Sequence, residues 1–241
     1  MRLDVYLTEQ GLVSSRTEAK GFISSSAVTV DGKIITKPAY DVVEGSVITL
    51  DKSSKKYVSR GGLKLEAAIN SFDIDVQNKK AIDIGASSGG FTDCLLQNGA
   101  ASVIAVDSGT NQLVEKLSND SRVISIENFN ARYMTPSDFP YRPSFACMDV
   151  SFISVTLIME ALYTVLAPEA DFVCLVKPQF EVGRSGIGKG GIVKDDKIRR
   201  EALARVISFA QGVGFSSLGA IPSPILGGDG NVEYLVHFRK G

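Results

Sequence analysis

The sequence predicts an α/β protein in which a doubly wound parallel sheet follows a small N-terminal α+β domain. Short apolar strands alternate with helical segments from residue 81 onward, which is typical of parallel strands connected by helices. A glycine-rich turn follows the first of these strands, whereas the first 50 residues read as two helices and then short strands. We therefore predict two domains, residues 1–58, which include a basic linker, and residues 59–241.

The small domain starts with helical spacing at Leu3 and Leu7. Ser14 or Ser15 can cap a second helix, whose apolar stripe reaches residue 23. Residues 28–30 predict a strand, and the Asp31-Gly32 pair that follows is a dipeptide typical of hairpin turns. Residues 34–35 continue the hairpin, and residues 46–50 predict a further strand.

The large domain is predicted to alternate strands and helices along its whole length. Strands are expected at 81–84, 102–106, 123–126, 145–148, 172–176, 215–221 and 232–238. Helices are expected at 62–72, from the glycine-rich turn to about residue 98, at 112–117 and at 194–211. In such sheets a ligand binds beyond the carboxyl ends of the strands, so the residues that end each strand are the candidates for function.

The composition is that of an ordinary globular protein, with 44% hydrophobic and 22% charged residues. The three cysteines are odd in number and form no C-x-x-C pair, which argues against a disulfide scaffold or a zinc site and fits a reducing compartment. The N-terminus lacks the apolar segment of a signal peptide, and no apolar run is long enough to span a bilayer. We expect a cytoplasmic, monomeric protein with neither a metal nor a membrane partner.

Positive charge is concentrated in the first quarter of the chain, although the net charge is −1. Residues 1–64 carry 10 Lys/Arg against 7 Asp/Glu, and residues 52–64 hold five positive charges and no acid. A second basic run spans residues 177–200. Such patches can dock a phosphate backbone, although solvated helix and linker surfaces have the same composition.

The segment AIDIGASSGGFTDCLL carries the strongest local signal. Gly85, Gly89 and Gly90 follow a buried strand that contains Asp83, and glycines let the backbone turn tightly and approach a ligand. The spacing is G-x-x-x-G-G and not the G-x-G-x-x-G of dinucleotide enzymes. The next strand leads into Asp107, whose carboxylate could accept both hydroxyls of a ribose. Together these features resemble the cofactor site of class I methyltransferases, which bind S-adenosylmethionine.

That resemblance implies a set of cofactor-binding residues. They are Asp83, Gly85, Ser87, Gly89, Gly90, Phe91, Thr92, Asp107, Asn130 and Asp149. Asn130 follows the third strand and either lies near the adenine or simply caps a turn.

The N-terminal pattern RLDVYL…SSRTEAKGFI…AVTVDGKIITKPAYDVVEGSVI resembles the S4 RNA-binding domain. In that family two helices present basic side chains to structured RNA. The resemblance implies RNA contacts by Arg2, Arg16, Lys20, Lys33 and Lys37. To these we add Lys55, Lys56 and Arg60 in the basic linker, and Arg184 and Lys189 in the glycine-rich loop 183–191, which could contact RNA or act as a lid.

Four charged residues stand in positions that solvation alone does not explain. Lys64 lies in a helix before the first strand, Asp149 and Lys177 end the fourth and fifth strands, and Glu233 opens the last strand. Lys-Asp-Lys-Glu in this order resembles the catalytic tetrad of FtsJ/RrmJ-type RNA ribose 2′-O-methyltransferases. Together with the S4 pattern, YVSRGGLKL, DVSFIS, LVKPQFE and GGIVKD, it is similar to the TlyA family, whose members methylate cytidine ribose in ribosomal RNA and are often labelled haemolysins.

The resemblance implies that a ribose hydroxyl must be placed in line with an activated methyl group and must lose its proton. Lys177 is the candidate base, because burial and the like charge of Lys64 would favour its neutral form. Asp149 would hold Lys177, and Glu233 would orient Lys64 or the ribose. Lys64 could instead steady the developing alkoxide, so the sequence leaves the two lysine roles open.

Three other functions compete with this interpretation. The chain could be an S4-type RNA- or ribosome-binding protein whose methyltransferase fold is inactive, but the four charged residues argue against that. A membrane-lytic haemolysin would need an amphipathic basic helix or an apolar hairpin, and neither is found in the sequence. A nicotinamide-dependent oxidoreductase is disfavoured by the glycine spacing and by a single histidine, His237. The family also leaves open whether the small-subunit RNA, the large-subunit RNA or both are methylated.

Overall fold

The computed structural model describes residues 1–24, 27–51, 56–183, 187–188, 190–227 and 230–241. The chain forms two compact units, Met1–Arg60 and Gly61–Gly241.

The N-terminal unit packs two helices on a small antiparallel sheet, as the sequence predicts. Its helices are α1 (Leu3–Glu9) and α2 (Arg16–Ser24), and its strands are β1 (Val28–Val30), β2 (Lys33–Ile34) and β3 (Ile48–Leu50), in the order β2-β1-β3. Ser15 accepts a hydrogen bond from the Glu18 amide and so caps α2. Asp31 and Gly32 both have positive φ, at 50° and 76°, as a two-residue hairpin turn requires. Leu3, Leu7 and Ile23 are fully buried in the core of this unit.

The C-terminal unit is built on a seven-stranded sheet with the order β6-β5-β4-β7-β8-β10-β9. The strands are β4 (Lys80–Ile84), β5 (Ser102–Val106), β6 (Val123–Ile126), β7 (Phe145–Met148), β8 (Asp171–Val176), β9 (Phe215–Pro222) and β10 (Tyr234–Lys240). β4 to β8 pair in parallel, and β10 runs antiparallel to both of its neighbours. Every residue of β7 and β8 is buried, so both faces of the sheet are covered.

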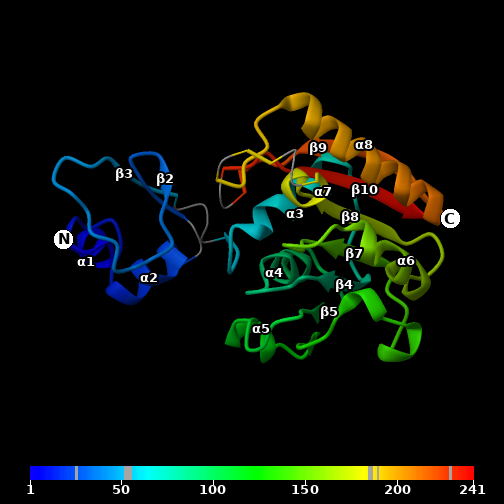
Figure 1. Cartoon of the computed structure of the whole chain (residues 1–241). Helices are drawn as coiled ribbons and strands as arrows, with labels where there is room; N and C mark the ends of the chain where they lie inside the picture. The colour runs from blue at the N-terminus through cyan, green and yellow to red at the C-terminus, as the bar shows by residue number, and fades with distance from the viewer. Residues whose placement is uncertain (25–26, 52–55, 184–186, 189, 228–229) are drawn as a thin grey trace. The chain divides into compact units, whose positions relative to one another are not determined.

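Helices connect these strands, and Figure 1 shows them around the sheet. They are α3 (Gly61–Ser71), α4 (Gly90–Gln97), α5 (Glu115–Ser118), α6 (Thr156–Val165), α7 (Pro178–Glu181) and α8 (Asp196–Val213), with the 3₁₀ turns η2 (Ala131–Tyr133) and η3 (Pro136–Asp138). α3 packs on α4, whereas α6 packs on α8. This order and these connections confirm the predicted α/β fold class.

The helix expected at 112–117 starts three residues later than predicted. The amides of Asn111, Gln112 and Leu113 all donate to the carboxylate of Glu127. The first amides of a helix have no helical acceptor. Here a carboxylate of the next connection binds three consecutive amides, and Asn111 has φ +55°, so these residues form a turn and the helix begins after them.

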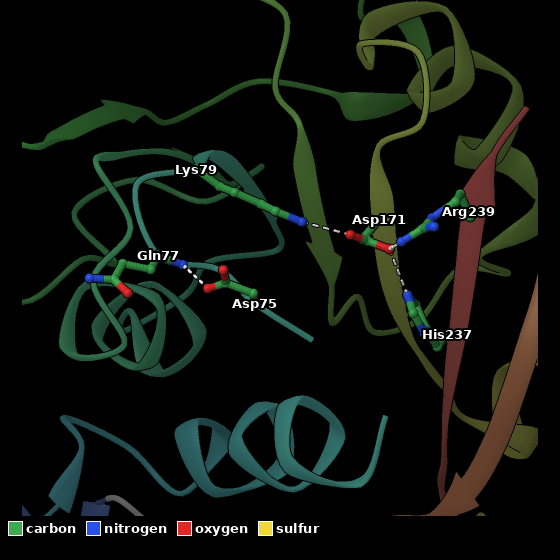
Figure 2. A network of polar contacts seen from close by, with 6 residues as sticks. All are labelled: Asp75, Gln77, Lys79, Asp171, His237 and Arg239. Atoms are coloured by element: carbon green, nitrogen blue, oxygen red, sulfur yellow. Dashed lines mark hydrogen bonds and ion pairs between the residues drawn. The ribbon is translucent and has the colours of Figure 1, made fainter. Parts of the chain in front are cut away.

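A buried charge network joins strands at the amino ends of β4 and β8 (Figure 2). Asp171 accepts hydrogen bonds from Lys79 (2.6 Å), from Arg239 (2.8 Å) and, through Nε2, from His237 (2.9 Å). Burial alone would raise the pKa of Asp171, but these donors hold it well below its ordinary value. The single histidine is therefore part of a structural network at the edge of the sheet opposite to the strand ends that carry the candidate site.

Candidate active site

The turn after β4 can be made only with glycine at two positions. Gly85 has φ +81°, and a Cβ there would lie 2.4 Å from the backbone oxygen of Asp149. Gly89, the N-cap of α4, has φ +95°, and a Cβ would lie 2.3 Å from the Leu117 side chain. The backbone therefore passes close to the loop that follows β7, and the amino end of α4 faces the carboxyl ends of the strands.

Asp107 lies at the end of β5 with both carboxylate oxygens oriented by backbone amides. Oδ2 accepts from the Ser87 amide and Oδ1 from the Gly109 amide, each at 2.7 Å. A carboxylate has further lone pairs beyond these two bonds. Asp107 is thus held rigidly and keeps acceptor capacity for two adjacent hydroxyls.

A cavity of about 380 Å³ opens beside this turn, within the size range of small-molecule sites. Five of the residues that the sequence predicted to bind the cofactor line this cavity: Gly85, Ser87, Asp107, Asn130 and Asp149. Val106, Phe129, Ala131 and Ile158 supply apolar walls. The cavity thus combines apolar walls with two carboxylates, Asp107 and Asp149.

The remaining residues of the predicted cofactor set are not among those that line this cavity. They are Asp83, Gly89, Gly90, Phe91 and Thr92. Asp83 Oδ2 accepts from Thr92 Oγ1 at 2.7 Å, while its buried Oδ1 has no hydrogen-bond partner among the described residues. Burial is the main reason that the pKa of Asp83 is raised to about 7. Asp83 on β4 and Thr92 on α4 thus bind each other across the turn and do not line the cavity.

Asn130 fulfils one of its two predicted alternatives and remains compatible with the other. Its Oδ1 accepts the Arg132 amide at 3.1 Å and so caps η2. The same residue lines the cavity, with its amide group still able to donate.

Asp149 and Lys177 form an ion pair between two adjacent strand ends. Lys177 Nζ lies 2.6 Å from Asp149 Oδ1 and donates to Ser151 Oγ at 2.8 Å. Only 10% of the Lys177 side chain and 22% of the Asp149 side chain is exposed. β7 and β8 are parallel neighbours, which is why residues 28 positions apart meet here. Ser151, which the sequence did not single out, lines the cavity together with Asp149.

Lys64 and Glu233 form the second ion pair of the predicted tetrad. Lys64 Nζ donates to Glu233 Oε2 at 2.6 Å, and both side chains are at most 10% exposed. A Cβ at Gly227 would lie 2.3 Å from Glu233 Oε1, so that glycine leaves room for the carboxylate. The tetrad predicted from sequence thus appears as two lysine–carboxylate pairs.

Asn231 is a further residue that the sequence did not reveal. It is 1% exposed, accepts from the Val193 amide and donates to the Gly191 carbonyl, each at 3.0 Å. It therefore ties the end of the glycine-rich loop to the segment that leads into Glu233. No local sequence pattern marks such a contact, because an asparagine in a glycine-rich loop also reads as a turn residue.

In the N-terminal unit, one buried carboxylate organises two exposed arginines. Asp4 is fully buried, and Arg2 and Arg16 donate to it at 2.9 Å while about half of each arginine side chain stays exposed. The bond from Arg2 is the main reason that the pKa of Asp4 lies well below its usual range. Lys20, Lys33, Lys37 and Lys56 are exposed and Arg60 is half-buried, whereas Lys55, Arg184 and Lys189 lie outside the described residues.

Comparison with known proteins decides the family. The model of FtsJ-like methyltransferases matches residues 57–240. The chain belongs to the FtsJ-like methyltransferase family. The model of the S4 domain matches residues 1–48 of this FtsJ-like protein. The resemblance to FtsJ-type methyltransferases and the resemblance to the S4 domain are therefore confirmed.

Two curated relatives and one solved structure span nearly all of the FtsJ-like chain. Hemolysin A of Brachyspira hyodysenteriae is 46% identical over 99% of each protein. The 16S/23S rRNA (cytidine-2′-O)-methyltransferase TlyA of Mycobacterium tuberculosis is 41% identical over 99% of this chain and 89% of its own length. A solved structure from Streptococcus thermophilus, 48% identical, has a TM-score of 0.80 and covers all of this chain and 88% of the other. Across the described part of the FtsJ-like chain, no helix is both long and apolar enough to cross a membrane.

Proposed function

We propose that this protein transfers the methyl group of S-adenosylmethionine to the 2′-hydroxyl of a cytidine ribose in ribosomal RNA. The observation that carries the proposal is the Asp149–Lys177 pair, because Asp149 lines the cavity and contacts the buried amine. A positioned amine next to a cofactor cavity is what deprotonation of a ribose hydroxyl requires. The curated relative that is named for cytidine-2′-O-methylation of 16S and 23S RNA supports the same substrate.

The volume of the cavity and the chemistry of the groups that line it suit S-adenosylmethionine. Asp107 would accept the ribose hydroxyls, the apolar walls would hold the adenine, and Asp149 would place negative charge near the sulfonium. The cofactor supplies an activated methyl group. A side chain at position 85 would clash with the Asp149 backbone, so the glycine lets the ends of β4 and β7 lie close together beside the cavity.

The four charged residues would each have a different role at the ribose 2′-hydroxyl. Lys177, once it has lost its own proton, would accept the proton of the hydroxyl, and Asp149 and Ser151 would hold its amine in place. Lys64, oriented by Glu233, would stabilise the negative charge that develops on the ribose oxygen. Both lysines are about 10% exposed, so water competes little with these interactions.

The N-terminal unit would bind the RNA through its arginine pair and its exposed lysines. Guanidinium groups recognise phosphates in bidentate fashion, and Asp4 holds two of them on one surface. The relative named for both 16S and 23S RNA favours a substrate on both subunits. The predicted monomeric state stays a prediction.

Two experiments test this function at separate levels. S-adenosylmethionine and S-adenosylhomocysteine should raise the melting temperature of the protein, and NAD should not; a shift by NAD alone would overturn the cofactor assignment. Nucleoside mass spectrometry of ribosomal RNA should show 2′-O-methylcytidine in cells with the gene and its loss on deletion. Unchanged 2′-O-methylcytidine after deletion would exclude the proposed product.

A further inference from the structure

The connection after β7 carries a short arc, residues 150–154, that forms one wall of the cofactor cavity. Val150, Ser151, Phe152 and Ile153 all line the cavity. Phe152 is 91% exposed and has φ +65°, a conformation that bulky residues rarely adopt. An arc in such a conformation keeps its shape only if neighbouring groups hold it.

Helix α7 holds the arc at both ends. At the near end, Lys177, the N-cap of α7, donates to Ser151 Oγ at 2.8 Å. At the far end, Glu181, the last residue of α7, accepts from Ser154 Oγ at 2.5 Å and from the Val155 amide at 2.9 Å. Between these points the Phe152 ring lies 5.2 Å from the Phe180 ring.

The far-end contact depends on a carboxylate. Val155 is 1% exposed and is the N-cap of α6, where amide donors lack helical partners and negative charge is favoured. Glu181 gives one oxygen to this amide and the other to the Ser154 hydroxyl, and Arg205 of α8 donates to its backbone carbonyl at 3.4 Å. Glutamine has one acceptor oxygen, so it cannot satisfy both donors in the same way.

We propose that Glu181 is a positioning residue that fixes the arc, so that Ser151 stays on Lys177 and the Phe152 ring stands at the cavity mouth where the RNA nucleotide arrives. The identity of that substrate rests on the proposed function, whereas the fixing of the arc does not. Glu181 contacts neither the cavity nor the lysine amine in the described structure. Its effect on the reaction is therefore indirect, through the geometry of the two strand ends.

The arc can be observed directly, because the chain contains no tryptophan. Phe152→Trp places a single fluorophore on the arc. We expect lower anisotropy and faster acrylamide quenching of this probe when Glu181→Gln or Ser154→Ala is added. Glu160→Gln, the same change on an exposed residue of α6, should leave both signals unchanged. Equal anisotropy in all four proteins would overturn the proposal.

Activity gives the second readout, measured with Phe152 restored. Glu181→Gln should lower kcat about 10- to 100-fold, as small displacements of reacting groups do, with little change in the KM for RNA or in the melting temperature. Glu181→Asp should recover part of the loss, and Glu160→Gln should match the wild type. If Glu181→Gln does not fold, Ser154→Ala gives the same test. A wild type that methylates no RNA would refute the proposed function, and the fluorescence would still decide the role of Glu181.

Discussion

Lys64 Nζ lies 2.6 Å from Glu233 Oε2, although the two residues are 169 positions apart in the chain. The ion pair thereby joins α3, the first helix of the domain, to the start of β10, its last strand. A buried ion pair is costly to desolvate, and it is often no more stable than an apolar pair of similar size. We therefore expect this pair to serve the proposed reaction more than the stability of the fold.

Replacing both residues of this pair separates its contribution to stability from its contribution to methyl transfer. Glu233→Ala alone should lower the free energy of unfolding by about 3–5 kcal/mol, because Lys64 would remain buried and unpaired. Lys64→Met with Glu233→Leu should recover most of that stability and yet have no methyltransferase activity. Chemical denaturation and a methyl-transfer assay measure the two quantities. An active double variant would show that the pair is purely structural.

Lys177→Ala should abolish methyl transfer and leave cofactor affinity near that of the wild type. The amine contacts Asp149 and Ser151, but Lys177 itself is not among the cavity-lining residues. Calorimetric titration with S-adenosylhomocysteine measures the affinity, and single-turnover kinetics measure the transfer. Lys80→Ala, which removes an exposed lysine at the amino end of β4 and thus at the opposite edge of the sheet, is the matched control. Full activity of Lys177→Ala would remove this residue as the base.

The arginine pair of the N-terminal unit should contribute to RNA binding mainly through phosphate contacts. Arg2→Ala and Arg16→Ala should each weaken binding and reduce the slope of log K against log salt by about 1. Asp4→Asn should weaken binding as well, because the arginines would lose the carboxylate that aligns them. Filter binding at several salt concentrations gives these slopes. Variants with the wild-type slope would place the RNA on another surface.

Asp83 should make the unliganded protein less stable as the pH rises. Its carboxyl keeps the proton up to pH about 7 in the folded protein, whereas it ionises near 3.8 when unfolded. The unfolded state therefore gains stability between these pH values, and the contribution of this group to folding falls by an amount on the order of 4 kcal/mol. Denaturation of wild type and Asp83→Asn at pH 5 and pH 8 tests this. A stability difference between the two proteins that does not change with pH would contradict it.

The sequence predicted the sheet and the pair Asp149–Lys177 at its strand ends for a physical reason. Parallel strands bring their carboxyl ends to one edge, so Asp149 and Lys177 had to lie close once their strands were recognised. The glycine turn and Asp107 could be placed in the same way. The late start of α5 was missed, because Glu127, a residue outside that segment, takes the amides that would have begun the helix.

Residues that act between loops could not be predicted from sequence. Glu181 and Asn231 each accept from a backbone amide of a different connection, and Gly227 leaves room for the Glu233 carboxylate within its own connection. Their spacing follows neither the helical nor the strand period, which is the information that sequence patterns carry. Only the folded chain brings these partners together.

The most direct test of the account is transfer of tritiated methyl from S-adenosylmethionine to purified ribosomal subunits that lack the modification, followed by mapping of the labelled nucleotide. We expect label on the ribose 2′-oxygen of a cytidine with the wild type, and none with Lys177→Ala. Cofactor binding without label on either subunit or on intact ribosomes would contradict it, and would favour an RNA-binding protein without methyltransferase activity.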